Sequence, residues 1–268
     1  MKEKAQLKLS RKLKMTDLIK IFPEYEDVFY DDIENHKKYF LPICSINLKI
    51  IDPSENQWLH IVSVKEIFDG QIGDSTSQYH TRFTKADMLG FDVIDGKYKF
   101  DADWNYFTIS KEIDPANYGD QYSEEEIEYS VNSAMYSLLK AYFNKNGKLY
   151  DKDFNRPGLE VEDIRRLERL RQLTVQDLEN DAPNEYLQER IQGKISSVFD
   201  EINSDKLPFE SCQFSGDNLI EKPYKNDTEL MDYIGCLEGY DFQKWAADQL
   251  YLFYDKELKK AVICFEYT

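Results

Sequence analysis

Apolar and aromatic residues gather in the first part of the chain in short runs that predict β-strands. Residues 39–51 are dense in β-branched and aromatic side chains, and Asp52-Pro53 ends this run. Residues 58–64 form a second run, which we expect to be its antiparallel partner. Residues 91–100 predict a hairpin, because Asp95-Gly96 supplies the positive φ angles of a tight turn. A further strand is expected over residues 104–110.

The pattern changes at Ser123, where a long amphipathic helix is expected. Ser123 and Glu126 form a capping-box pair, and the apolar positions that follow recur with a helical period. Asn146-Gly147 provides a helix stop.

Three other helices are expected on weaker patterns. Residues 160–172 and 183–203 each carry one apolar stripe. Residues 16–22 predict a short helix that is capped by Thr16 and stopped at Pro23.

The last part of the chain returns to strand-like composition. Residues 207–214 predict a strand and residues 241–249 a short helix. Residues 250–254 and 261–267 predict a strand pair that is apolar on both sides, and such strands are covered on both faces. We therefore expect them to be central to a sheet with helices against it. The core residues predicted here are Phe253, Ile263 and Phe265.

This order of elements predicts an α+β fold with mixed, largely antiparallel sheets and a helical middle segment. Residues 1–15 form a basic lead-in, and residues 16–268 form a single α+β domain. That domain divides into two lobes, 16–120 and 205–268, which are joined by the helical segment 122–204. The two lobes are candidates for related halves.

Composition supports a folded protein with an acidic body. Of the 268 residues, 41% are hydrophobic and 14% aromatic, which is enough apolar material for a core. The net charge is −17, and residues 1–15 hold six basic residues and one acid, which leaves −22 for the remainder. Such a body repels nucleic acid and anionic membranes and favours basic partners, although acidity also serves solubility alone.

No secretory signal or membrane span is indicated, since no sufficiently long apolar run occurs. The four cysteines are widely spaced, without a C-x-x-C pair, which favours a reducing cytoplasm. The three histidines do not pair at helical spacing, so neither a metal nor a cofactor is expected.

Asp101 and Asp103 are the candidate catalytic residues. If residues 101–103 are extended, both carboxylates point to one face, where they could bind Mg²⁺ or act as acid and base. The alternative is a solvated strand entry in a protein with 51 acidic residues.

The most polar loop covers residues 69–82, and it is either the rim of a binding site or an open connection. Its polar residues are Asp69, Asp74, Ser75, Thr76, His80 and Arg82. The candidate binding residues are Asp74, His80 and Arg82 from this loop, together with Trp104.

Ser137-x-x-Lys140 matches a serine–lysine pattern of penicillin-binding enzymes. It lies inside the predicted amphipathic helix, and no Lys-Thr-Gly follows, so we interpret it as coincidence.

The C-terminal third resembles the YwqG-like family of bacterial cytoplasmic proteins. Residues 212–214 (CQF) look like an apolar–Gln–apolar strand of that family, and residues 250–268 look like its closing strand–turn–strand. Residues 41–48 echo 207–214, as the family's internal duplication implies, but Ser45 stands where Gln is expected. The resemblance implies a mixed α+β fold with two related halves and no established reaction. Relatives of such domains are thought to be immunity proteins beside bacterial toxins.

Two functional hypotheses follow. The first is a non-enzymatic cytoplasmic protein-binding protein, in its specific form an immunity protein with a basic toxin as partner. The second is a carboxylate- or metal-dependent hydrolase that uses Asp101 and Asp103.

Overall fold

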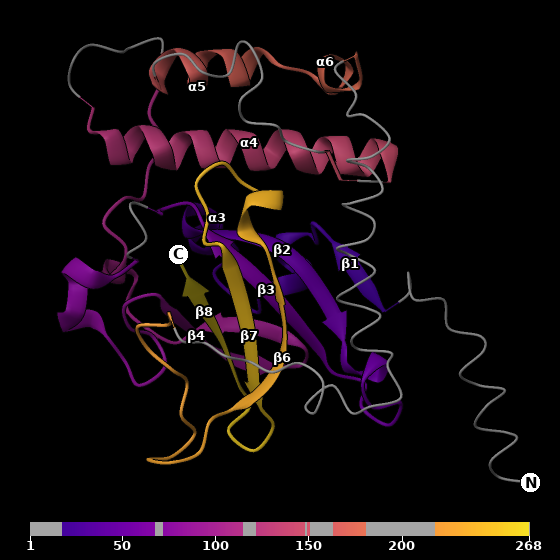
Figure 1. The fold of residues 1–268 in the computed structure, drawn as a ribbon, viewed down its shortest axis with the longest axis vertical. Helices are drawn as coiled ribbons and strands as arrows, with labels where there is room; N and C mark the ends of the chain where they lie inside the picture. The colour runs from indigo at the N-terminus through magenta and orange to yellow at the C-terminus, as the bar shows by residue number, and fades with distance from the viewer. Residues whose placement is uncertain are drawn as a thin grey trace, which may run out of the picture.

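The computed structural model describes residues 18–67, 72–114, 122–147, 149–150, 163–180 and 218–267. Two antiparallel sheets pack together, and a long helix crosses one end of them (Figure 1). This arrangement confirms the α+β class.

The strands are β1 (Ile19–Ile21), β2 (Phe40–Asn47), β3 (Trp58–Val64), β4 (Met88–Ile94), β5 (Lys97–Phe100), β6 (Asp232–Leu237), β7 (Gln249–Asp255) and β8 (Lys260–Glu266). The α-helices are α2 (Tyr25–Val28), α3 (Ile33–Tyr39), α4 (Glu124–Asn146), α5 (Asp163–Gln172) and α6 (Val175–Asn180), and the 3₁₀ turns are η2 (Leu48–Ile50), η3 (Asp74–Tyr79), η4 (Trp104–Tyr106) and η6 (Gly239–Asp241).

The first sheet has three strands in the order β1-β2-β3. Ser45 of β2 lies opposite His60 of β3, and Ile46 lies opposite Leu59, so the expected antiparallel pairing of these two runs is confirmed. All eight residues of β2 are buried. A strand of this kind needs cover on both faces, which the second sheet and α4 provide.

The helix expected over residues 16–22 is wrong in the described part of that range. Ile19–Ile21 is a strand, in which Ile19 lies opposite Ile46 and Ile21 opposite Cys44. A helix of seven residues makes few internal hydrogen bonds, whereas an edge strand gains ladder bonds to β2.

The second sheet has five strands in the order β5-β4-β8-β7-β6, and all its pairings are antiparallel. The β4–β5 hairpin turns at Asp95 and Gly96, whose φ angles are 50° and 78°, as predicted. The C-terminal strand β8 is the central strand, as predicted. The sheet takes β4 and β5 from before the helical segment and β6, β7 and β8 from after it.

Both faces of the β7–β8 pair are buried, which confirms the core prediction. Phe253, Ile263 and Phe265 are each at most 1% exposed. Ile263 and Phe265 belong to the main core between the sheets, and β3 packs against both β7 and β8. Phe253 faces a smaller core on the opposite side, where its neighbours include Phe83 and Met231. Helices were expected there, but among the described residues the cover comes from the segments around Phe83 and Met231.

Helix α4 confirms the strongest local prediction. The Ser123 hydroxyl accepts the Glu126 N–H, and the Glu126 carboxylate accepts the Ser123 N–H, which completes the capping box. Gly147 ends the helix with a φ of 66°. Figure 1 shows α4 lying between the sheets and α5. The hydroxyl of Tyr136 fixes α4 to the first sheet by donating to the carbonyl of Pro42.

Helix α5 matches the helix expected over residues 160–172, and its Leu167 and Leu170 are buried. Helix α6 was not expected. The predicted helix 183–203, the predicted strand 207–214 and the basic lead-in 1–15 lie outside the described residues.

The strand expected over residues 104–110 is wrong. The segment instead forms η4 and an irregular stretch. The Asp103 carboxylate accepts the Asn105 N–H, and the buried Glu66 carboxylate accepts the N–H groups of Thr108 and Ile109. These side-chain acceptors take the place of a neighbouring strand.

The helix expected over residues 241–249 is also wrong. Only the short turn η6 precedes an irregular segment. Here the Trp245 N–H donates to the side chain of Asn132, and the Gln243 side chain donates to the Trp245 carbonyl, so remote partners replace intrahelical bonds.

The loop expected over residues 69–82 is more regular than predicted from residue 72 onwards. It contains η3, in which Thr76 is buried and donates to the Tyr106 carbonyl. None of the helices in the described ranges is long and apolar enough to cross a membrane.

We predict that Ile263→Ala lowers the free energy of unfolding by about 2–5 kcal/mol, because it leaves a cavity in the central strand of the sheet. Urea denaturation measures the change. Leu258→Ala, at a 43% exposed position in the β7–β8 turn, is the control and should stay within about 0.5 kcal/mol of the parent. Equal effects of the two changes would contradict a buried central β8.

Candidate functional site

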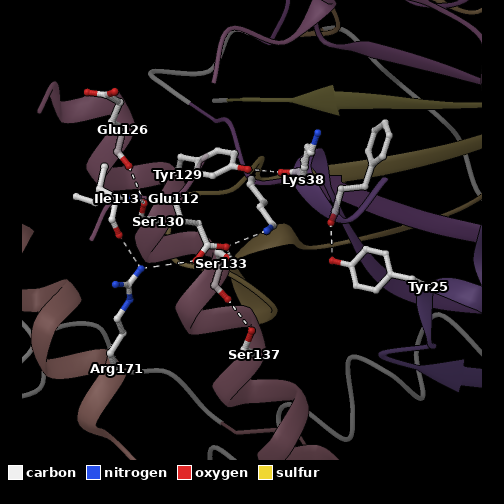
Figure 2. A network of polar contacts seen from close by, with 12 residues as sticks. Tyr25, Lys38, Glu112, Ile113, Glu126, Tyr129, Ser130, Ser133, Ser137 and Arg171 are labelled. Carbon is white, nitrogen blue, oxygen red and sulfur yellow. Dashed lines mark hydrogen bonds and ion pairs between the residues drawn. The ribbon is translucent and has the colours of Figure 1, made fainter. Parts of the chain in front are cut away.

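One carboxylate, that of Glu112, links the first sheet to helices α4 and α5 (Figure 2). Its Oε1 accepts the ammonium of Lys65 at 3.1 Å and the hydroxyl of Ser133, and its Oε2 lies 3.7 Å from the Arg171 guanidinium. Lys65 follows β3, Ser133 lies on α4 and Arg171 on α5. Arg171 also donates to the carbonyl of Ile113 at 2.9 Å.

Burial and charge act against each other in this cluster. The Lys65 side chain is 9% exposed, and this burial lowers the pKa of its ammonium, which Glu112 partly opposes. Burial raises the pKa of the Glu112 carboxyl, but Lys65, Ser133 and Arg171 together outweigh it, so its pKa lies below the ordinary value. Glu112 is therefore ionised at neutral pH and holds the lysine in place.

A groove of about 470 Å³ opens beside this cluster, between α4 and the first sheet. Ser133, Tyr136, Ser137 and Lys140 line it from one face of α4, because they are spaced three or four residues apart. Lys65, Glu112, Tyr25 and Glu24 line the other side.

The hydroxyl groups of the groove are committed to the framework. The Tyr25 hydroxyl donates to the Phe40 carbonyl at 2.7 Å, and burial raises the pKa of this phenol. Ser137 donates to the Ser133 carbonyl at 2.9 Å. Lys140 donates to the Glu24 carboxylate at 2.9 Å. Ser137 and Lys140 thus have separate partners, as expected if their sequence pattern is a coincidence.

A second hollow, of about 420 Å³, lies at the first turn of α4, and we call it the acidic hollow. It is lined by Ser75, Thr108, Ile109, Ser123, Glu125 and Glu126. These side chains include two carboxylates and three hydroxyls. None of the described lining residues carries a positive charge. The N–H groups of the helix start favour negative charge at this place, and the pKa of Glu125 is lowered by its own N–H and by Ser123.

The two hollows follow each other along α4. The chain crosses the helix between them at Ile113, whose N–H donates to the Ser130 hydroxyl at 2.9 Å. Thr108 and Ile109 line the acidic hollow on one side of this crossing, and Glu112 lines the groove on the other.

Asp101 and Asp103 differ in burial and in hydrogen-bond partners. Asp101 is nearly buried, pairs with the Lys260 ammonium at 3.0 Å and accepts the hydroxyls of Thr81 and Thr84. Asp103 is exposed and accepts both the backbone and the side-chain N–H of Asn105 at 2.8 Å. Each carboxylate is therefore engaged by its own partners, and none of these partners is shared between the two.

The other candidate residues are spread over three neighbourhoods. Asp74 is exposed at the start of η3, next to Ser75 of the acidic hollow. His80 donates from Nε2 to the Gly73 carbonyl at 2.8 Å. Arg82 is exposed and donates to the Lys225 carbonyl.

Trp104 belongs to an aromatic cluster. Its ring stacks on Tyr39 at 5.4 Å and meets the edge of His36 at 5.0 Å. The candidate loop therefore reaches a hollow through Ser75, while the partly buried Trp104 packs against the core.

In the described ranges, no group of three or more histidine, cysteine or acidic side chains could hold a metal ion. His60 illustrates how the histidines are used. Its Nε2 donates to the Gly96 carbonyl at 2.8 Å, so Nδ1 accepts the Ser45 hydroxyl at 2.7 Å. Burial lowers the pKa of His60 to about 4, which keeps the ring neutral.

Comparison of the chain with protein-family models, curated proteins and solved structures finds no match.

Glu112 and Lys65 were not predicted from the sequence. Each is an ordinary charged residue beside a predicted strand, and the sequence carries no signal of their pairing. The capping box did mark Ser123 and Glu126, but as a helix start and not as the wall of a hollow.

We predict that Glu112→Gln lowers the free energy of unfolding at pH 7 by about 1–3 kcal/mol, because Lys65 loses its counter-charge while Glu112 itself is partly exposed. The pKa of Glu112 is lowered on folding, so its contribution is present above the ordinary carboxyl pKa and is lost as the pH falls.

The difference between parent and variant should therefore shrink below about pH 4.5 in denaturation curves measured across pH. Glu221→Gln removes the partner of Lys85, whose side chain is 36% exposed where that of Lys65 is 9%, and is the matched control, with an expected loss below about 1 kcal/mol. A loss for Glu112→Gln that does not depend on pH would contradict the electrostatic account.

Proposed function

We propose that this chain is a protein-binding protein with a basic partner, and that the acidic hollow receives a cationic side chain of that partner. The observation that carries the proposal is the lining of this hollow. Glu125 and Glu126 provide carboxylate acceptors, and Ser75, Thr108 and Ser123 provide hydroxyls. Lysine and arginine end in groups that only donate hydrogen bonds, so this lining suits either of them.

The charge of the whole chain supports the same partner. A net charge of −17 attracts a basic protein over long range and speeds encounter, while a close pair at a defined place fixes orientation. The exposed carboxylate of Glu125 is available for such a pair at the surface.

The groove beside the hollow favours binding over nucleophilic chemistry. The hydroxyl protons of Tyr25, Tyr136 and Ser137 are donated to backbone carbonyls, so these groups hold the framework together. The Ser133 hydroxyl does donate to the Glu112 carboxylate, but Lys65 and Arg171 lower the pKa of that carboxyl, which makes it a weak base for activating a nucleophile.

The resemblance to the YwqG-like family suggests the specific form of the proposal. In this form the chain is a cytoplasmic immunity protein and its partner is a basic bacterial toxin. The proposal that it binds a basic protein does not depend on this specific form.

We predict that Glu125→Lys weakens retention of the basic partner about tenfold, because it places a like charge where the partner's cation docks. The immobilised protein captures partners from an extract of its native cells across a salt series, and the bound proteins are identified by mass spectrometry.

Glu257→Lys is the matched control, since it changes the net charge equally at an exposed position in the β7–β8 turn. Circular dichroism verifies that α4 is retained in both variants. Equal weakening by the two variants would mean that the partner responds to net charge and not to the acidic hollow. Captured proteins that are not basic would refute the proposal.

A further inference from the structure

Asp87 ties three parts of the chain together just before β4. It is 2% exposed and has a left-handed backbone, with a φ of 54°. Its Oδ1 accepts the Ile72 N–H at 2.8 Å, and its own N–H donates to the Ile72 carbonyl at 2.9 Å. Its carbonyl accepts the N–H of Phe265 in β8 at 2.9 Å. Asp87 therefore attaches the segment 72–80 to β4 and β8, while Tyr106 of η4 holds the segment separately, because its hydroxyl donates to the Ile72 carbonyl at 3.0 Å and its carbonyl accepts the Thr76 hydroxyl.

Two buried oxygens in this region have no hydrogen-bond partner among the residues that the structure describes, namely Oδ2 of Asp87 and the hydroxyl of Tyr267. Tyr267 directly follows β8, and Asp87 is among the charges that raise the pKa of its phenol, after burial itself. An ionised carboxylate with a bare buried oxygen is costly, and a proton on that oxygen removes the charge.

The surroundings of Asp87 offer little to stabilise a negative charge. Burial raises the pKa of its carboxyl to about 7, against the opposing effect of the Ile72 N–H, and the carboxylate of Asp74 on η3 adds to the rise. Tyr106 of η4 also lies in this region, but its hydroxyl donates to the carbonyl of Lys85 at 2.7 Å.

The charged and titratable groups that the structure describes nearby are otherwise engaged or neutral. They are the Lys85 ammonium, paired with Glu221; the Glu66 carboxylate, which acts on Tyr106; the Cys264 thiol of β8, whose pKa burial raises; and Tyr240 and Asp248, which act on Tyr267.

The segment fits closely against its neighbours. A Cβ at Gly73, which has a φ of 77°, would lie 2.2 Å from the ring of Tyr106. His80 closes the segment by donating to the Gly73 carbonyl. Displacing Ile72 would therefore move the whole turn that carries Ser75.

We propose that a proton on Asp87 latches the segment 72–80 against β4 and β8, and that loss of this proton releases the segment. The latch lies in the free protein and does not rest on the proposed partner. Because Ser75 lines the acidic hollow, the latch would make the shape of that hollow depend on pH.

The direction of the effect follows from proton linkage. The pKa of Asp87 is raised on folding, so the stabilising contribution of its proton is complete below the ordinary carboxyl pKa and is lost as the pH rises from there to beyond about 7. Between pH 6 and pH 8 the opening equilibrium of the segment should rise about tenfold.

Two measurements on the full chain test the latch. The carboxyl carbon resonance of Asp87 is titrated by NMR, and the protection factors of the amides of Ile72, Thr76 and Phe265 are measured by hydrogen exchange at pH 6 and pH 8. We expect titration near neutral pH and about a tenfold loss of protection at Ile72 and Thr76.

Asp87→Asn is the informative variant, because Asn copies the neutral acid in shape and tolerates the left-handed backbone. Its protection factors should not change between the two pH values. Asp227→Asn, at an exposed position, is the control and should behave as the parent.

Either titration of Asp87 at an ordinary carboxyl pKa, or protection of the segment that is independent of pH in the parent, would overturn the latch. Both results come from the parent protein, so they decide the question even if Asp87→Asn does not fold.

Discussion

The pairing of β4 with β8 is the interaction on which the rest of the structure depends. It brings Met88 opposite Cys264 and Asp92 opposite Lys260, across the whole helical segment of the chain. Closing so long a loop has an entropic cost that local contacts cannot offset. The burial of β8 on both faces provides the compensation, and the Lys260 ammonium adds contacts at 2.7 Å to Asp92 and 3.0 Å to Asp101. The turn held by Asp87 is positioned against this sheet, and α4 is fixed to the first sheet that packs on it.

Where the sequence predicted the fold correctly, the signal was local. Asp95-Gly96 sets a turn by backbone preference, and Ser123 with Glu126 sets a helix start by reciprocal hydrogen bonds. The two C-terminal strands were recognised because a run that is apolar on both sides needs cover on both sides. The failures lie where distant side chains bind the backbone. Glu66 holds residues 108–109, and Asn132 holds the N–H of Trp245, and neither pairing is visible in a local pattern.

The same distinction explains the candidate sites. The polar loop around Ser75 was noticed from its composition, and part of it does line a hollow. Glu112 and Asp87 were missed, because in a chain with 51 acidic residues nothing local marks the few that bind distant parts of the chain. These two acids share one use, since each joins parts of the chain that lie far apart in sequence. Glu112 joins a sheet to two helices, and Asp87 joins a turn to two strands. The exposed acids, such as Glu125, remain available to attract a partner.

The central claim is that an acidic surface becomes a specific site at the start of α4. Its most direct test is an NMR titration of the ¹⁵N-labelled protein with a short arginine-rich peptide at low and moderate salt. The account predicts that amide shift changes concentrate at Ser75, at residues 108–109 and at residues 123–126, and that they weaken as salt is added. Shift changes spread evenly over the exposed acidic segments, including those around Asp227 and Glu257, would contradict it.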